Sequence, residues 1–234
     1  DYTKLATQLD AVKTDVKSKI GSEDAAYIRR VILAQRACEW TGRILLMLGF
    51  IQPLLWVVGV LSLATAKILD NMEIGHNVMH GQYDWMNDQH INSKAYEWDI
   101  ACDGSSWNRV HNYEHHTYTN IIGMDEDVDA GIILRFSHDQ EKKTLHKFQH
   151  IYAWFVYGLL TISWLVSKDF IQLIKYNKKG LLKSQGISFT KALFSLLFWK
   201  VIYVFLILIL PTLVTGNLGI NIAGFFIMEF IAGF

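Results

Sequence analysis

Long apolar runs constrain the fold of this chain more than any other feature of its sequence. Residues 44–66, ILLMLGFIQPLLWVVGVLSLATA, carry no charge, and residues 192–214 carry only Lys200. A third apolar run extends over residues 218–234. A helix of about 20 apolar residues is long enough to cross the hydrocarbon core of a bilayer. We therefore expect an all-α fold, an integral membrane helical bundle, rather than a soluble domain.

The overall composition agrees with a membrane protein and excludes other classes. Hydrophobic residues make up 51% of the chain and charged residues only 19%, with a mean hydropathy of +0.19. The 22 basic and 22 acidic residues balance, so the chain lacks the basic excess that is typical of nucleic-acid binding. Its two cysteines, Cys38 and Cys102, form no CxxC pair and predict no disulfide framework.

The distribution of lysines predicts how the chain is oriented in the membrane. Lys142, Lys143 and Lys147 precede the apolar segment 151–167, and more lysines follow it from Lys168 onward. Excess lysine and arginine mark the cytoplasmic side, so both ends of this segment are expected there. The segment is therefore predicted to lie in the interface or against the bundle. The polar, histidine-rich stretch before it is predicted to form a cytoplasmic cap.

We predict a single membrane domain, residues 1–234, truncated at its C-terminus because the chain stops inside an apolar run. Before the first histidines two topologies remain open: a single crossing by 44–66, or a hairpin around Gly49–Pro53 or an additional span. The predicted parts are an N-terminal amphipathic arm (1–42), a first transmembrane region (43–69), a cytoplasmic histidine-box segment (70–150), an interfacial or membrane helix (151–167) and a transmembrane hairpin (192–234).

Five histidines occur at two spacings that favour metal binding. His76 and His80, in GHNVMH, are four residues apart, which places both side chains on one face of a helix. His111, His115 and His116, in HNYEHH, repeat that spacing and add a ring about 100° away. The offset would let one segment serve two metal ions. A role in packing alone explains five histidines at these spacings much less well than a shared metal site does.

The surrounding residues narrow the choice of metal. Imidazole ligands suit zinc, copper, iron or nickel. A zinc protease would need HExxH, and Asn77 stands where its glutamate would be. Bis-imidazole haem would need isolated histidines inside the spans, whereas these are clustered beyond an apolar run. The acidic turn at 124–129 lacks the glycine and glutamate of a calcium loop. A pair of irons is the option that remains.

The order of these motifs resembles the membrane-bound fatty acid desaturases, and most closely their bacterial acyl and front-end groups. An apolar span, then GHNVMHGQYDW, then WNRVHNYEHHTYTN and GMDED, follows that family's pattern from about residue 40 to the end. The resemblance implies a four-span bundle with a cytoplasmic cap. It also implies that the histidine boxes bind two iron ions. Its third histidine box would follow residue 234.

The resemblance further implies a reaction and its partners. Its first box maps onto His76 and His80, and its second onto His111, His115 and His116, as metal ligands and catalytic residues. The enzyme would be an oxidoreductase that uses O₂ and electrons from an external donor of the ferredoxin or cytochrome b5 type. It would place a double bond in an acyl-lipid or acyl-CoA chain. The expected location is a bacterial inner membrane, as a multi-pass protein with its histidine boxes on the cytoplasmic side.

Two other functions would also use a group of histidines at these positions. A di-iron hydroxylase of lipids or alkanes would use the same histidines and differ only in its product. A non-enzymatic membrane carrier of metal or haem would bind its cargo without consuming O₂.

The candidate residues for the substrate channel or for supporting the ligands are Asn77, Trp85, Trp107, Asn112 and Asn120.

Overall fold

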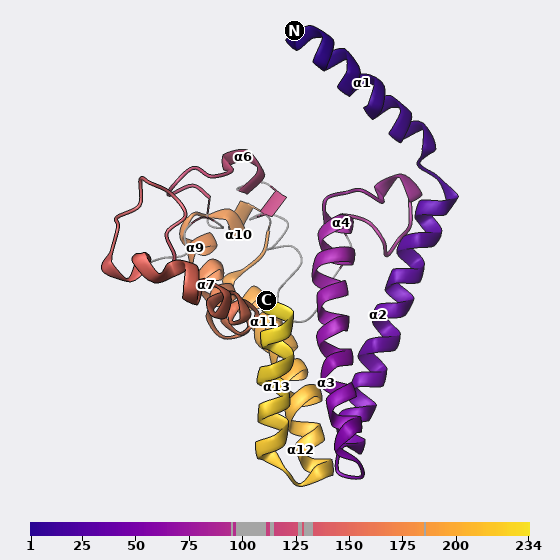
Figure 1. Ribbon diagram of the computed structural model, residues 1–234, viewed down its shortest axis with the longest axis vertical. Coiled ribbons are helices and arrows are strands. Elements are labelled where there is room, and N and C mark those ends of the chain that lie inside the picture. The colour runs from indigo at the N-terminus through magenta and orange to yellow at the C-terminus, as the bar shows by residue number, and fades with distance from the viewer. Residues whose placement is uncertain (95, 97–110, 113–114, 126–127, 129–132, 185) are drawn as a thin grey trace.

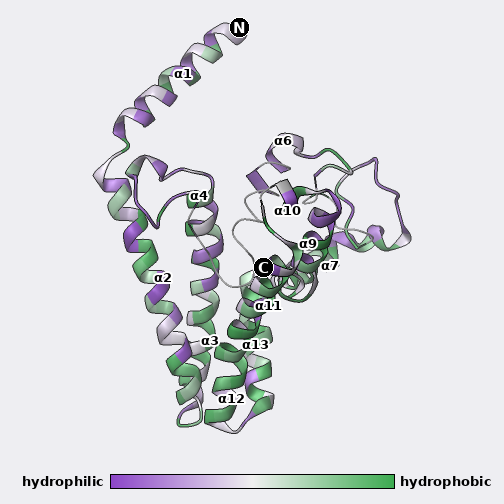
Figure 2. Cartoon of the chain, turned by 180° about the vertical axis from the view of Figure 1, so that it is seen from behind, coloured by the Kyte–Doolittle hydropathy of each residue, from purple (hydrophilic) through white to green (hydrophobic). Residues whose placement is uncertain are grey.

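The computed structural model describes residues 1–234 except 95, 97–110, 113–114, 126–127, 129–132 and 185, and the regular secondary structure in these residues is helical. Long helices pack side by side, and shorter helices and loops gather at one end of them (Figure 1). Figure 2 shows hydrophobic residues concentrated along α3, α11, α12 and α13. The expected all-α membrane bundle is confirmed. The elements of the N-terminal half are α1 (Tyr2–Lys19), α2 (Ser22–Leu48), α3 (Pro53–Ile68), η1 (Leu69–Gly75), α4 (His76–Met79), η2 (Asp84–Met86) and α6 (His116–Tyr118).

The second half of the chain is also built from helices, several of which follow one another with little or no break. In this half, the helix Phe189–Thr215 has the length and apolar composition of a membrane span, and the bent pair Thr144–Gly158 and Leu160–Lys178 has them when it is taken as one span. The helices of this half are η4 (Thr144–Phe148), α7 (Gln149–Gly158), α8 (Leu160–Ser163), η5 (Trp164–Lys168), α9 (Asp169–Lys178), α10 (Leu181–Ser184), α11 (Phe189–Val204), η6 (Phe205–Ile209), α12 (Leu210–Thr215) and α13 (Leu218–Gly233).

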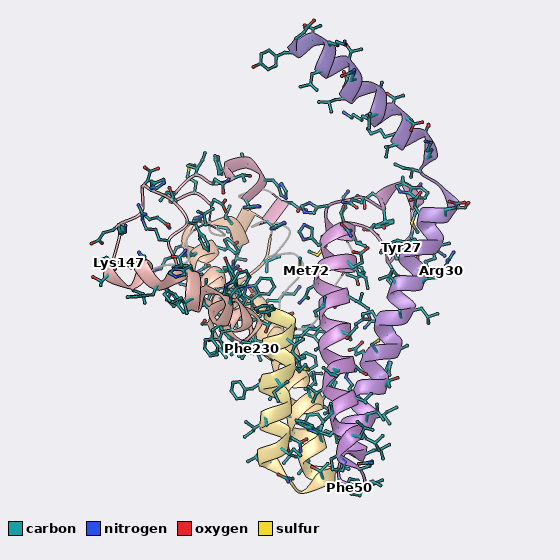
Figure 3. The ribbon with its side chains drawn as sticks, viewed as in Figure 1. Tyr27, Arg30, Phe50, Met72, Lys147 and Phe230 are labelled. Carbon is teal, nitrogen blue, oxygen red and sulfur yellow. The ribbon has the colours of Figure 1, made fainter. Side chains whose placement is uncertain are left out.

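The apolar run at 44–66 is not one helix but a helical hairpin around Gly49–Pro53, the second of the two arrangements that the sequence left open. Its first residues finish α2, the chain reverses after Leu48, and α3 begins at Pro53. Proline is suited to this first helical position because its missing N–H would have no partner within the helix. Gln52 caps the new helix by accepting a hydrogen bond from the backbone N–H of Leu54 (3.3 Å). Phe50 marks the tip of this hairpin (Figure 3).

The predicted boundaries at 42/43 and 69/70 both fall inside helices. The first lies within α2, which runs without a break from the amphipathic arm into the hairpin. The second lies within a continuous helix, Pro53–Met79, made of α3, η1 and α4. This helix is long and apolar enough to cross a membrane. The first histidines therefore sit at the end of a candidate span.

The last apolar residues form a hairpin. The helix Phe189–Thr215 is long and apolar and is the second candidate span. The chain turns at Gly216, which has a left-handed φ of 66°, and Asn217 caps α13 by accepting from the N–H of Ile220 (3.2 Å). Figure 1 shows α13 returning beside α12 and α11. Residues 192–234 therefore lie within two antiparallel apolar helices.

The segment 151–167 is broken at Leu159, between α7 and α8. The helices on either side, Thr144–Gly158 and Leu160–Lys178, are bent by 60° and together form a broken span or a re-entrant loop. In Figure 1, α7 runs across the direction of α3 and α13 rather than along it. The bend places α7 beside the end of α13, where Gly158 meets the ring of Phe230.

Buried charged groups join the helices inside the bundle. Lys67 of α3 and Glu229 of α13 are 4% and 1% exposed, and their charged atoms lie 3.7 Å apart. Glu229 also accepts a hydrogen bond from the hydroxyl of Tyr203 in α11. The backbone carbonyl of Glu229 accepts from Thr161 of α8 (2.6 Å). Four helices that are distant in sequence are thereby connected by polar contacts in an apolar interior.

The backbones of α2 and α3 approach each other closely at Gly42 and Gly59. A Cβ atom on Gly59 would lie 2.9 Å from the backbone nitrogen of Leu46 and 3.1 Å from the carbonyl oxygen of Gly42. Both are backbone atoms, which cannot move aside as a flexible side chain can. Glycine here allows α2 and α3 to approach with their backbones nearly in contact.

We predict that Gly59→Ala destabilises the protein, by about 1–3 kcal/mol, because the added methyl group forces the two helices apart. Gly219→Ala is the matched control, because the nearest atom to its added Cβ is 3.7 Å away. The control should be neutral or slightly stabilising, since alanine favours helix more than glycine does. Thermal unfolding in detergent measures both. Equal melting temperatures for the two variants would contradict the close approach.

Candidate metal centre

The continuous helix Pro53–Met79 carries His76 near its end, and His80 follows directly after it. A wide π-helical turn, η1, precedes α4, and the N–H of His76 donates to the carbonyl of Asn71, five residues earlier. The side chain of Asn77 donates to the carbonyl of Glu73 (2.7 Å), a backbone group in this turn. His76 and His80 then lie one turn apart, with ring centroids 4.7 Å from each other. Turns of this kind are frequent at functional sites.

The third histidine comes from a distant segment and completes a group of three. His111 has its ring 4.9 Å from that of His76 and 5.1 Å from that of His80. One ligand nitrogen from each of the three lies within 4.8 Å of the others. Nitrogens that share one metal ion at about 2.1 Å must lie within about 4.2 Å of one another. The three rings therefore need only a small contraction to hold an ion.

The last two histidines extend the cluster. The ring of His116 lies 4.7 Å from that of His80, and the ring of His115 lies 5.1 Å from that of His111. His115 and His116 are themselves 5.2 Å apart. The structure therefore brings all five predicted histidines together. A set of imidazole nitrogens suits zinc, copper, iron or nickel.

An aspartate buried beside the cluster orients one of the rings. Asp125 is 1% exposed, and its Oδ1 lies 2.9 Å from Nδ1 of His115. Its Oδ2 accepts from the backbone N–H of Asn120 (2.8 Å), a residue with a left-handed φ of 64°. A carboxylate on Nδ1 leaves Nε2 of His115 to bind a metal. Metal-binding histidines usually have such a partner.

A second hydrogen bond connects the two histidine segments. The side chain of Asn112 donates to the carbonyl of Met79 at 2.6 Å. Met79 precedes His80, and Asn112 follows His111. The bond therefore fixes the second segment against the end of the first helix, which holds the two sets of rings at contact distance.

The surroundings of His80 make a positive charge on its ring unfavourable. Burial, followed by the neighbouring imidazoles of His76 and His111, lowers the pKa of His80 to about 4. The ring is therefore neutral at physiological pH. Neutral imidazole is the form that binds metals.

The other candidate residues are three asparagines and two tryptophans, and they differ in how they relate to the histidine cluster. Asn77, Asn112 and Asn120 contribute hydrogen bonds that support the histidine segments, Asn120 through its backbone. Trp85 lies in η2, is 40% exposed, and makes no contact with the five histidines that the structure describes. Trp107 lies outside the described residues. Asp125 was not among the predicted site residues, although the acidic turn that contains it was noted.

This architecture has a counterpart among known proteins. The fatty acid desaturase family matches residues 51–234, which include the spans and all five histidines. The chain belongs to this family. No solved structure gives a significant match.

Several curated relatives are similar to the chain. The NADPH-dependent stearoyl-CoA 9-desaturase of Mycobacterium tuberculosis is 46% identical over 178 residues, which are 76% of this chain and 41% of that protein. The sn-1 linoleoyl-lipid 6-desaturase of Synechocystis sp. is 30% identical over 51% of this chain and 33% of that protein. The Delta(5) fatty acid desaturase A of Dictyostelium discoideum is 29% identical over 73% of this chain and 37% of that protein. The chain therefore spans about two fifths or less of the length of these relatives.

We predict that Asp125→Asn lowers the affinity for iron by about 10–100-fold, the usual effect of removing a carboxylate that orients a histidine ligand. Asp139→Asn is a matched control, because Asp139 is exposed and distant in sequence from the cluster. Iron content of the purified intact protein, measured after dialysis against graded chelator, compares them. Equal retention in both variants would show that Asp125 does not support a ligand.

We predict that His80 makes the metal-free protein less stable in acid. The unfolded histidine takes up a proton near pH 6.5, whereas the folded one does so near pH 4. Between these values the unfolded state binds more protons, so the free energy of unfolding falls as the pH falls through this range. The melting temperature of wild type should therefore drop more between pH 7 and pH 4.5 than that of His80→Gln. Identical pH profiles would contradict the lowered pKa.

Proposed function

We propose that the protein is an oxygen-dependent acyl desaturase whose metal centre includes His76, His80, His111, His115 and His116. The observation that carries the proposal is the convergence of these five rings at the end of a candidate span, in a chain of the desaturase family. In this proposal, residues 1–234 form one membrane domain. The histidine segment is the part that performs the chemistry.

The cofactor is proposed to be a pair of iron ions. Iron with O₂ would supply the oxidant that an unactivated C–H bond requires. The chain's own residues hold five imidazole rings close together, and Asp125 lies at Nδ1 of His115, which leaves Nε2 to bind the metal. The group His76, His80 and His111 has the geometry for one ion. His115 and His116 are proposed as ligands of the second.

The substrate is proposed to be an acyl-CoA. The Mycobacterium tuberculosis relative, at 46% identity, is named as a stearoyl-CoA desaturase. The Synechocystis relative is named as a lipid desaturase and is more distant, at 30% identity. An acyl chain is apolar and can approach the centre along the spans that end there. An acyl-lipid substrate is therefore the second choice.

The electrons are proposed to come from an external donor. The Mycobacterium tuberculosis relative is named as NADPH-dependent. A ferredoxin or cytochrome b5 type protein could transfer electrons from NADPH to the centre. The proposed setting is a bacterial inner membrane with the histidine cluster on the cytoplasmic side, because lysine-rich stretches follow the histidines in sequence on both sides of residues 151–167.

We predict that the intact protein, expressed in a host of known lipid composition with a donor system, produces a new unsaturated fatty acid. His76→Gln should abolish the product, because it removes a ligand from the group of three. His138→Gln is the matched control and should retain full activity, since this histidine is exposed and outside the cluster. Gas chromatography and mass spectrometry of the fatty acids measure the product and the double-bond position.

The same experiment separates the alternatives. A hydroxylated acid that is lost in His76→Gln would assign the centre to hydroxylation instead of desaturation. Equal product from wild type and His76→Gln would overturn the proposed metal centre. Iron bound without any product, in the presence of the donor system and O₂, would favour a carrier.

A further inference from the structure

A cavity of about 540 Å³ runs along α7, and its lining includes none of the five histidines of the metal centre. Arg135, Lys142, His146 and His150 line its basic part. Trp154 and Tyr157, farther along the helix, give it an aromatic end. Among the residues that the structure describes, none that lines the cavity is acidic. We call this the α7 cavity.

The basic end of the α7 cavity is held in place by hydrogen bonds. Arg135 donates from Nε to the carbonyl of Gln140 and from Nη2 to the carbonyl of His138, both at 2.7 Å. Its backbone N–H and carbonyl bond the side-chain amide of Gln149 in α7. These contacts fix the guanidinium beside the helix. An ordered positive charge loses less entropy on binding an anion than a mobile one does.

A histidine adds a second fixed donor. Nδ1 of His146 accepts a hydrogen bond from the backbone N–H of Lys143 (3.1 Å). The neutral ring must then carry its proton on Nε2, the other nitrogen. The polar groups of this end are therefore mostly donors and cations, which suit an anion with several oxygen acceptors.

The aromatic end adjoins the bundle. The ring of Trp154 lies 6.1 Å from that of Phe234, at the end of α13. One turn farther on, Gly158 lies against the backbone at Gly233. The α7 cavity thus extends from a basic region to the point where α7 meets a membrane helix. Trp and Tyr are enriched at the level of lipid headgroups.

The opposite face of α7 indicates where the helix lies. Phe148, Ile151 and Phe155 are 57%, 65% and 61% exposed, and they project away from the side that carries His146 and His150. Figure 3 shows α7 running outward from the bundle toward Lys147, across the direction of the spans. An exposed apolar face beside basic groups, here contributed by Arg135, Lys142 and His146 from the segment before α7, is the arrangement of an interfacial helix with its apolar side in the acyl region. The α7 cavity then opens at the level of the phosphates.

We propose that the α7 cavity binds the phosphate headgroup of an anionic membrane phospholipid. Arg135, Lys142 and His146 would contact the phosphate oxygens, and Trp154 and Tyr157 would pack on the glycerol and the first part of an acyl chain. The change from basic to aromatic lining matches an amphiphile with an anionic head. A soluble phosphate would use only the basic end. This site is separate from the metal centre and does not depend on the proposed reaction.

The test compares lipid binding by two variants that lose the same charge. Lys142 lines the cavity, whereas Lys143 does not and lies 3.9 Å from Glu141. The intact protein and its Lys142→Gln and Lys143→Gln variants are titrated in detergent with phosphatidylglycerol and, separately, with phosphatidylcholine. Native mass spectrometry counts the bound lipids. Coenzyme A and inorganic phosphate serve as soluble competitors.

The expected result is preferential binding of phosphatidylglycerol, weakened about fivefold by Lys142→Gln, the usual effect of one basic residue near an anionic surface. Lys143→Gln should bind as wild type does. Equal binding of both lipids, or an equal effect of both substitutions, would overturn the proposal. Displacement of phosphatidylglycerol by coenzyme A or phosphate at equal concentration would also overturn it, by assigning the cavity to a soluble ligand.

Discussion

The structure depends on one unbroken helix, Pro53–Met79, that is both a candidate membrane span and the support of the first metal ligands. Its apolar part packs against α2 through the contact of Gly59 with Gly42, which fixes its position. Its last turns leave the apolar bundle and present His76 and His80. Because the helix is continuous, the position of those two rings follows directly from how the helix packs in the membrane.

The polar groups inside the bundle also help to fix the positions of the helices. Charged side chains in an apolar interior are costly unless they are paired, and removing one partner is strongly destabilising. Lys67 and Glu229 form such a pair between α3 and α13, and Tyr203 adds a hydrogen bond from α11. A second buried pair, Lys200 with Asp169 at 2.7 Å, joins α11 to α9. These contacts have a strict geometry, so they define the register of the helices more closely than apolar packing alone.

Local sequence patterns predicted the apolar helices and the candidate ligands, because each depends on spacing within one segment. The i, i+4 relation of His76 and His80 is an example. At residues 44–66 the sequence left a single crossing and a hairpin open, because hydropathy alone does not show where an apolar run reverses; the structure places the reversal after Leu48. Sequence also did not assign Asp125 to the site, because its contact with His115 depends on how the following turn folds. The pair formed by Lys67 and Glu229 is a contact between distant segments that no local pattern indicates.

The central claim is that five imidazoles from two segments form one metal centre. Iron K-edge X-ray absorption of the purified intact protein tests this most directly, because it reports the atoms bound to the metal. The account predicts a nitrogen-rich shell with the outer scattering of imidazole rings, and a weaker imidazole signal in His111→Gln. A shell dominated by sulfur or by a porphyrin, or an imidazole signal unchanged by that substitution, would contradict the account.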